Sequence, residues 1–227
     1  MQRIRAKICG LRDPEQALRI AQMGADAIGL VFAPSPRWVS PEQAQAVTDA
    51  LPPLVDAVGV FVDSDATAIN NVISRVGLQW VQLHGQEPPE LVGDLARSCI
   101  KAFPVQDAMW IDRVRAWLDC VCDRRRVRGI LLDAGSETAR GGTGQRFNWD
   151  WVAQARLEGK LKDLPPLILS GGLNSGNVSD AIDMVQPWAV DVSSGVESAP
   201  GLKDLRKVED FLRAIREGTP LRSEFWL

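Results

Sequence analysis

Cys9 stands where a thiol could do chemistry. It ends the short apolar run Ala6–Cys9, and Gly10 and a helix-start signal at Asp13-Pro14 follow it. Because side chains alternate along a strand, Lys7 is expected on the same face as Cys9. A nearby ammonium group favours the thiolate, so the pattern predicts a thiol whose pKa is lowered by Lys7. The alternative is a buried structural cysteine, and position alone does not separate the two.

Two carboxylates also occur in apolar runs. Asp133 closes the run Gly129–Asp133, where a carboxylate is costly to place without a partner or a task. Partial burial would raise the pKa of Asp133, which suits a general acid or base; the alternative is an aspartate that caps a loop. Asp191 is expected on the same face as Ser193, either lining a pocket or as a buried structural hydrogen-bonding group.

Glycine and small hydroxyl residues cluster after three late apolar runs. Glycine lets backbone N–H groups approach an anion closely, and a helix N-terminus adds a favourable dipole. Ordinary turn chemistry is the alternative for any one of these loops. Three such loops in this order predict a phosphate site, with these candidate residues: Gly142, Thr143, Gly144, Gly171, Gly172, Ser193, Ser194 and Gly195.

Two further side chains suit ligand binding. Arg37 lies in the segment Pro34–Ser40, after the second apolar run, and arginine is well shaped for a bidentate carboxylate contact. Most arginines in loops are merely solvated. His84 is the only histidine and ends the fourth run, where a lone histidine is more often structural than catalytic. We expect it to line the pocket.

The elements that must position these side chains alternate along the whole chain. Nearly continuous apolar runs, typical of parallel strands covered on both faces, are predicted as strands over Ala6–Cys9, Ala27–Phe32, Ala57–Val62, Trp80–His84, Ile100–Pro104, Gly129–Ala134, Pro166–Ser170 and Ala189–Ser193. Amphipathic stretches between them are predicted as helices over Pro14–Met23, Pro41–Ala50, Ala66–Val76, Pro88–Ser98, Ala108–Cys122, Trp149–Glu158, Asn177–Val185 and Leu202–Arg216. Eight strand–helix units predict an α/β fold, a single-domain (β/α)8 TIM barrel with parallel strands. An open doubly wound sheet is the alternative, but no G-x-G-x-x-G follows the first strand.

Composition excludes several classes of protein. The 227 residues carry a net charge of −3, which does not suggest nucleic-acid binding, and no apolar run is long enough to span a membrane. The four cysteines lack C-x-x-C spacing, which disfavours a zinc site or a disulfide framework and points to a reducing cytoplasm. We expect one catalytic domain over residues 1–227, with a C-terminal tail from about residue 218.

An ordered set of motifs resembles the phosphoribosylanthranilate isomerase family of tryptophan biosynthesis. The motifs are Lys7-Ile8-Cys9-Gly10, Ser35-Pro36-Arg37, Val81-Gln82-Leu83-His84-Gly85, Leu131-Leu132-Asp133, Gly141-Gly142-Thr143-Gly144, Leu169-Ser170-Gly171-Gly172-Leu173 and Asp191-Val192-Ser193-Ser194-Gly195-Val196-Glu197. The resemblance spans residues 7–211. Each motif alone is weak evidence for this family, whereas the ordered set is specific to it.

The resemblance implies a (β/α)8 barrel that catalyses the Amadori rearrangement of N-(5-phosphoribosyl)anthranilate, without a metal or redox cofactor. It implies that Cys9 is the general base, Asp133 the general acid and Arg37 the contact for the anthranilate carboxylate. The glycine-rich loops would hold the phosphate, and His84 and Asp191 would line the pocket. The expected partner is this small molecule alone, with a monomeric or homodimeric protein. Alternatives are another phosphate-binding barrel isomerase and a non-catalytic binder of phosphate ligands.

Overall fold

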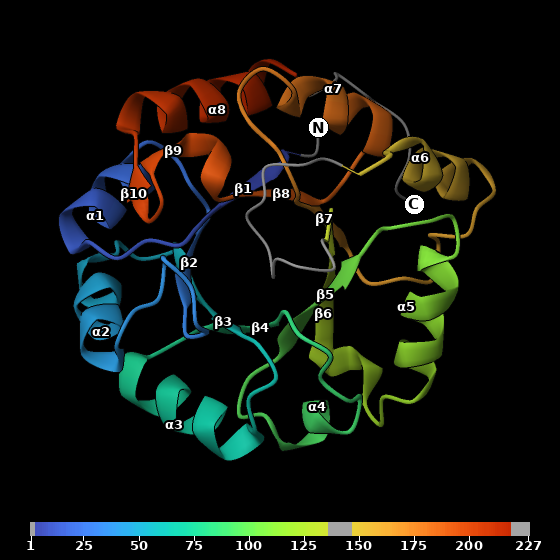
Figure 1. The fold of residues 1–227 in the computed structure, drawn as a ribbon, viewed down its shortest axis with the longest axis horizontal. Helices are drawn as coiled ribbons and strands as arrows, with labels where there is room; N and C mark the ends of the chain where they lie inside the picture. Colours follow the sequence, from blue (N-terminus) through green and yellow to red (C-terminus); the bar gives the residue numbers. More distant parts are fainter. Residues whose placement is uncertain (1–2, 136–146, 219–227) are drawn as a thin grey trace.

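The computed structural model of the protein, which describes residues 3–135 and 147–218, contains a closed barrel of parallel strands (Figure 1). The strands are β1 (Arg5–Cys9), β2 (Ala27–Val31), β3 (Asp56–Phe61), β4 (Trp80–Leu83), β5 (Cys99–Pro104), β6 (Val127–Asp133), β7 (Leu167–Leu169) and β8 (Ala189–Val192). All eight predicted strands are present within a few residues of their expected bounds, and the (β/α)8 prediction is confirmed.

The barrel closes because β1 pairs with both β2 and β8. In this register Lys7 lies opposite Asp191, and Cys9 lies opposite Gly29. Apolar side chains fill the interior of the barrel, in a cluster that contains Val58, Ile100, Ala102, Leu131, Ile168 and Ala189. The strands are therefore buried on both faces, which explains their nearly continuous apolar sequences.

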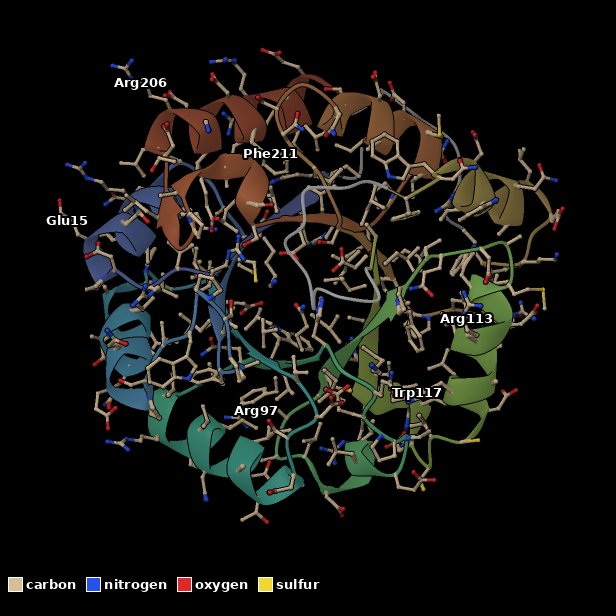
Figure 2. The ribbon with its side chains drawn as sticks, in the orientation of Figure 1. Glu15, Arg97, Arg113, Trp117, Arg206 and Phe211 are labelled. Atoms are coloured by element: carbon tan, nitrogen blue, oxygen red, sulfur yellow. The ribbon has the colours of Figure 1, made fainter. Side chains whose placement is uncertain are left out.

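Helices surround the barrel (Figure 1). They are α1 (Pro14–Gln22), α2 (Pro41–Ala50), α3 (Ala66–Val76), α4 (Leu91–Asp94), α5 (Trp110–Asp119), α6 (Asp150–Leu157), α7 (Val178–Val185) and α8 (Leu205–Glu217). Proline follows the N-cap residue in α1 and α2, as the sequence predicts. Figure 2 shows the two faces of α8: Arg206 projects outward, whereas Phe211 is fully buried against the barrel.

Two predicted helices are shorter than expected. The stretch Pro88–Ser98 forms only the single turn of α4, and the Asn70 side chain of α3 bonds the backbone of Asp94, its last residue, and of Ala96 just beyond it. The expected helix over Ala108–Cys122 is α5, trimmed at both ends. Tertiary hydrogen bonds thus override a periodicity that favours a longer helix at α4.

The structure adds elements that the sequence pattern does not predict. Strands β9 (Glu197–Ala199) and β10 (Leu202–Lys203) form an antiparallel hairpin where the expected start of the last helix lay. Two 3₁₀ helices, η1 (Arg124–Arg126) and η2 (Ser194–Val196), precede β6 and β9. In Figure 1 the hairpin lies near α1 and α8, beside the barrel.

The division of the chain into one domain with a tail from about residue 218 stays a prediction, since residues 219–227 lie outside the described part. Within the described ranges, no helix is long and apolar enough to cross a bilayer.

Candidate active site

A cavity of about 270 Å³ opens at the carboxyl ends of the barrel strands. This is the end of a (β/α)8 barrel at which catalytic residues gather. The described residues that the sequence singled out for chemistry or binding all line it: Cys9, Arg37, His84, Asp133, Gly171, Gly172, Asp191, Ser193, Ser194 and Gly195. The predicted residues therefore belong to one site, although they come from six different strand–loop junctions.

Cys9 ends β1 and is buried at the base of this cavity. Gly29 on the neighbouring strand makes room for it, because a Cβ at position 29 would lie 2.6 Å from the Cys9 Sγ. Lys7 shares the face of Cys9, as predicted, and donates a hydrogen bond to Asp191 Oδ1 at 2.7 Å. Ser170 Oγ donates to the other oxygen of Asp191 at 3.2 Å, so Asp191 is both pocket lining and a buried hydrogen-bonding group.

The expectation that Cys9 has a lowered pKa is wrong. Burial raises the pKa of the Cys9 thiol, and the positive charges of Lys7 and Lys203 offset this effect only in part. Lys7 itself keeps a raised pKa despite its burial, because Asp191 and Cys9 favour its charged form. Lys7 thus acts in the predicted direction, but in the free protein the thiol is the favoured form of Cys9.

Asp133 ends β6 and forms a chain of hydrogen bonds with His84 and Gln82. The Gln82 amide Nε2 lies 2.8 Å from His84 Nδ1, and His84 Nε2 lies 3.2 Å from Asp133 Oδ2. An amide NH₂ group can only donate, so His84 Nδ1 accepts and its Nε2–H donates to Asp133. The backbone N–H of Ala134 donates to Asp133 Oδ1 at 2.8 Å. Each carboxylate oxygen of Asp133 therefore accepts a hydrogen bond, one from His84 and one from Ala134.

The predicted rise in the pKa of Asp133 is also wrong. Burial does raise the pKa of this carboxyl group, but the hydrogen bond from His84, the Ala134 N–H and the charge of Lys7 together hold it below its usual range. In the free protein Asp133 is therefore a carboxylate. Its hydrogen-bond donors were not visible in the sequence, where only its burial could be inferred.

A buried ion pair fixes the loop that follows His84. Glu87 accepts hydrogen bonds from the backbone N–H groups of Gly85 and Asp63, at 2.9 and 3.0 Å. The Lys101 ammonium group donates to Glu87 at 3.1 Å and to the Gly85 carbonyl at 2.7 Å. Because all these contacts converge directly after β4, they hold His84 at the cavity.

Two of the three glycine-rich loops lie side by side at the cavity. Gly171 and Gly172 follow β7 with φ values of 82° and 68°, a conformation that favours glycine. A Cβ at Gly171 would come within 2.5 Å of the Ala134 nitrogen. The η2 turn places Ser194 and Gly195 beside them. Gly142, Thr143 and Gly144 lie outside the described residues.

Arg37 lies in the loop after β2, where it makes a contact that the sequence did not reveal. Its Nε and Nη2 groups donate to the two carboxylate oxygens of Glu197, each at 2.8 Å. Lys203, whose side chain is fully buried, donates to Glu197 Oε1 at 2.7 Å. Only 13% of the Arg37 side chain is exposed, so it is not a solvated loop residue.

Sequence reasoning missed four polar residues at or beside the cavity: Gln82, Ser170, Glu197 and Lys203. Gln82, Ser170 and Glu197 stand inside the quoted motifs, but nothing in their spacing marks them as functional. Lys203 lies on the hairpin, where the pattern predicts a helix. Its contact with Glu197 depends on the antiparallel pairing of β9 with β10.

The arrangement suits proton transfer on an anionic substrate. A thiol and a carboxylate face one cavity, and two glycine-containing loops line it, one of them with Gly171 and Gly172 at positive φ. Within residues 3–135 and 147–218, no group of three or more histidine, cysteine, aspartate or glutamate side chains is placed to hold a metal ion.

Comparison with known proteins gives the family. Residues 6–214 match the sequence family described as N-(5'phosphoribosyl)anthranilate (PRA) isomerase. The chain belongs to this family. It is 46% identical over 211 residues to N-(5'-phosphoribosyl)anthranilate isomerase of Geobacter metallireducens, covering 92% of this chain and 98% of the relative. It is 45% identical over 219 residues to the isomerase of Pseudomonas putida, covering 96% and 100%.

Solved structures of the PRA isomerase family have the same fold. The crystal structure of phosphoribosyl anthranilate isomerase from Thermotoga maritima is 40% identical, with a TM-score of 0.83 over 94% of this chain and 99% of that one. A second structure of a PRA isomerase, 39% identical with a TM-score of 0.79 and the same coverage, is a complex with reduced 1-(o-carboxyphenylamino)-1-deoxyribulose 5-phosphate. The family resemblance read from the motifs is therefore confirmed.

Proposed function

We propose that this protein converts N-(5'-phosphoribosyl)anthranilate into 1-(2-carboxyphenylamino)-1-deoxyribulose 5-phosphate, the Amadori rearrangement of tryptophan biosynthesis. The observation that carries the proposal is the meeting of Cys9 and Asp133 at one cavity, beside glycine loops suited to a phosphate. Membership of the PRA isomerase family supports the same substrate. The structure of a related PRA isomerase in complex with a reduced carboxyphenylamino-deoxyribulose phosphate supports a substrate that is bound through a carboxylate and a phosphate.

Asp133 acts as the general acid in this proposal. It delivers a proton to the ribose ring oxygen while the C1–O bond breaks, and the aniline nitrogen supplies the electron pair that forms an iminium ion. Cys9 then removes the proton from C2 as the general base. The electrons of the C2–H bond move into the iminium group, and the enolamine that forms tautomerises to the ketone.

The favoured protonation states of the free protein are the reverse of those that the chemistry uses. Cys9 is favoured as a thiol and Asp133 as a carboxylate. The catalytic form holds the same number of protons, with one moved from sulfur to oxygen. Because that proton count does not change, this form is a constant fraction of the protein between the two apparent pKa values of the pair.

The other candidate residues bind the two ends of the substrate. Arg37 pairs with the anthranilate carboxylate, since its guanidinium group keeps N–H donors beyond the two that Glu197 uses. Gly171, Gly172, Ser193, Ser194 and Gly195 hold the phosphate, and we retain Gly142, Thr143 and Gly144 in that role. His84 and Asp191 orient Asp133 and Lys7.

Two rival functions lead to different experimental results. A related isomerase of histidine biosynthesis uses an aspartate at the end of its first strand, where this chain has Cys9. A non-catalytic binder would hold the ligand without converting it. Cys9 at that position disfavours the first rival, and the presence of both a base and an acid at the cavity disfavours the second.

The test follows the anthranilate fluorescence of phosphoribosylanthranilate over time after the purified protein is added. The proposal expects a catalysed loss of fluorescence together with formation of the carboxyphenylamino product. Saturable binding without loss of fluorescence would identify a binder. Neither binding of phosphoribosylanthranilate nor loss of its fluorescence, together with turnover of the aldose substrate of the histidine pathway, would identify the rival isomerase.

We also propose a cytoplasmic protein that acts on this small molecule as a monomer or homodimer and binds no nucleic acid. One related structure is described as mutually generated monomers of the dimeric enzyme from Thermotoga maritima, which is the reason for keeping both states in the proposal. Sedimentation of the purified protein over a range of concentrations distinguishes the two states.

A further inference from the structure

The side chain of Glu197 holds Arg37, which lines the cavity, although Glu197 itself is not a lining residue. The contact is bidentate, with both Arg37–Glu197 distances at 2.8 Å, and only 5% of the Glu197 side chain is exposed. Bidentate arginine–carboxylate pairs fix direction as well as distance, because the guanidinium fork and the carboxylate are both planar. Glu197 therefore sets the orientation of the Arg37 group, and not only its position.

The carboxylate of Glu197 is itself held in place by the β9–β10 hairpin. Lys203 donates to Glu197 Oε1 at 2.7 Å and to the Ser193 carbonyl at 3.1 Å. The backbone of Lys203 exchanges two hydrogen bonds with the Gln16 side chain of α1, at 3.0 and 3.2 Å. Lys207 of α8 donates to the Glu197 carbonyl at 2.8 Å. Contacts from three elements thus prevent the carboxylate from following Arg37 if Arg37 moves.

The stem of Arg37 is confined as well. It packs on the backbone of Gly10, where a Cβ would lie 2.6 Å from the Arg37 Cδ. Glu197 uses two of the five guanidinium N–H groups, Nε–H and one on Nη2. Among the residues that the structure describes, the remaining three, including both on Nη1, have no other acceptor, and Arg37 lines the cavity. A second carboxylate can therefore approach an arginine that is already oriented.

We propose that Glu197 is a positioning residue that orients Arg37 for the carboxylate of the substrate, with the β9–β10 hairpin as its support. The inference rests on the proposed function, which supplies that carboxylate. Its physical basis is preorganisation: a side chain held in its bound geometry loses less conformational entropy when the ligand arrives. This preorganisation strengthens substrate binding and does not affect the rates of the proton transfers at Cys9 and Asp133.

Glu197→Gln tests the proposal because it keeps the size of the side chain but replaces one acceptor oxygen by an NH₂ group. The expected result is a KM for phosphoribosylanthranilate raised about 10-fold to 100-fold, with kcat within about 3-fold of the unchanged protein. Binding of the reduced carboxyphenylamino-deoxyribulose phosphate should weaken by a similar factor, whereas inhibition by inorganic phosphate should not change. Glu197→Asp, which shortens the side chain, should show the same pattern and serves as the test if Glu197→Gln does not fold.

The matched control is Glu42→Gln, which breaks an exposed glutamate–arginine pair with Arg75 outside the cavity and should leave KM and kcat unchanged. In an Arg37→Ala background, Glu197→Gln should change KM by less than about 2-fold, because the group that it positions is absent. A merely structural role for Glu197 predicts a lower thermal midpoint with unchanged KM, or equal effects in both backgrounds. Either result overturns the inference, whereas a failure of the proposed function appears separately, as no turnover by the unchanged protein.

Discussion

Gly10 is the position at which a single methyl group should disturb the substrate site without touching a reacting group. Its φ is +83°, in the left-handed region that favours glycine, and it directly follows Cys9. A Cβ there would lie 2.6 Å from Arg37 Cδ and 3.2 Å from Arg37 Cγ. Gly10→Ala therefore makes two separable changes, strain in the backbone and displacement of the Arg37 stem.

Both effects can be given magnitudes. The left-handed conformation costs an alanine roughly 1–2 kcal/mol, which lowers the thermal midpoint of a chain of this size by about 2–8 °C. The contact between Cβ and Cδ must open from 2.6 Å to an ordinary ~3.5 Å, so Arg37 moves by about 1 Å. A misplacement of that size reduces catalytic efficiency by up to about 100-fold. We expect the loss in KM, because Arg37 binds substrate in our proposal.

The assay is steady-state fluorescence kinetics together with thermal unfolding. Gly77→Ala is the control, because Gly77 also has a positive φ of 74° but nothing lies within 4 Å of its added Cβ. It should lose a similar amount of stability and keep its KM. If Gly10→Ala matches Gly77→Ala in both stability and KM, then Arg37 either does not move or does not bind substrate, and the reasoning fails.

Three further predictions concern the acid–base pair. Cys9→Ser should lower kcat by about 10²–10⁴-fold with KM nearly unchanged; near-normal kcat would remove Cys9 from the mechanism. Lys7→Met should move the pH dependence of Cys9 alkylation upward, since the charge of Lys7 lowers the thiol pKa; an unshifted curve contradicts that electrostatic contact. Because the pKa of Asp133 is lowered and that of Cys9 raised, kcat/KM should stay flat from about pH 5 to 8 and fall only outside that window; a steep limb near pH 7 would argue against reversed protonation.

The sequence was sufficient to predict the barrel and the meeting of Cys9, Arg37, His84, Asp133 and Asp191 at its mouth. Continuous apolar runs such as Gly129–Asp133 are typical of strands buried on both faces, and their alternation with helices leaves few topologies. Once the barrel is predicted, Cys9 and Asp133 fall at the same end, because both close a strand. The phosphate loops after β7 and β8 follow from the same argument.

The electrostatics of the site could not be predicted in the same way. The pKa of Asp133 depends on His84 and Ala134, and that of Cys9 on a balance between burial and two lysines. His84 follows β4 and Lys203 lies on β10, and strand periodicity does not fix the distances from these side chains to Asp133 and Cys9. Glu197 was missed for a related reason, since its partner Arg37 is 160 residues away in sequence.

The most direct test mixes phosphoribosylanthranilate with excess protein and follows a single turnover by anthranilate fluorescence, for the unchanged protein and for Asp133→Asn. Our account predicts rapid conversion by the unchanged protein. Asp133→Asn should bind the substrate with similar affinity but convert it about 10²–10⁴-fold more slowly. Conversion by Asp133→Asn at the rate of the unchanged protein, or no conversion by the unchanged protein, would contradict the claim that this cavity performs the rearrangement.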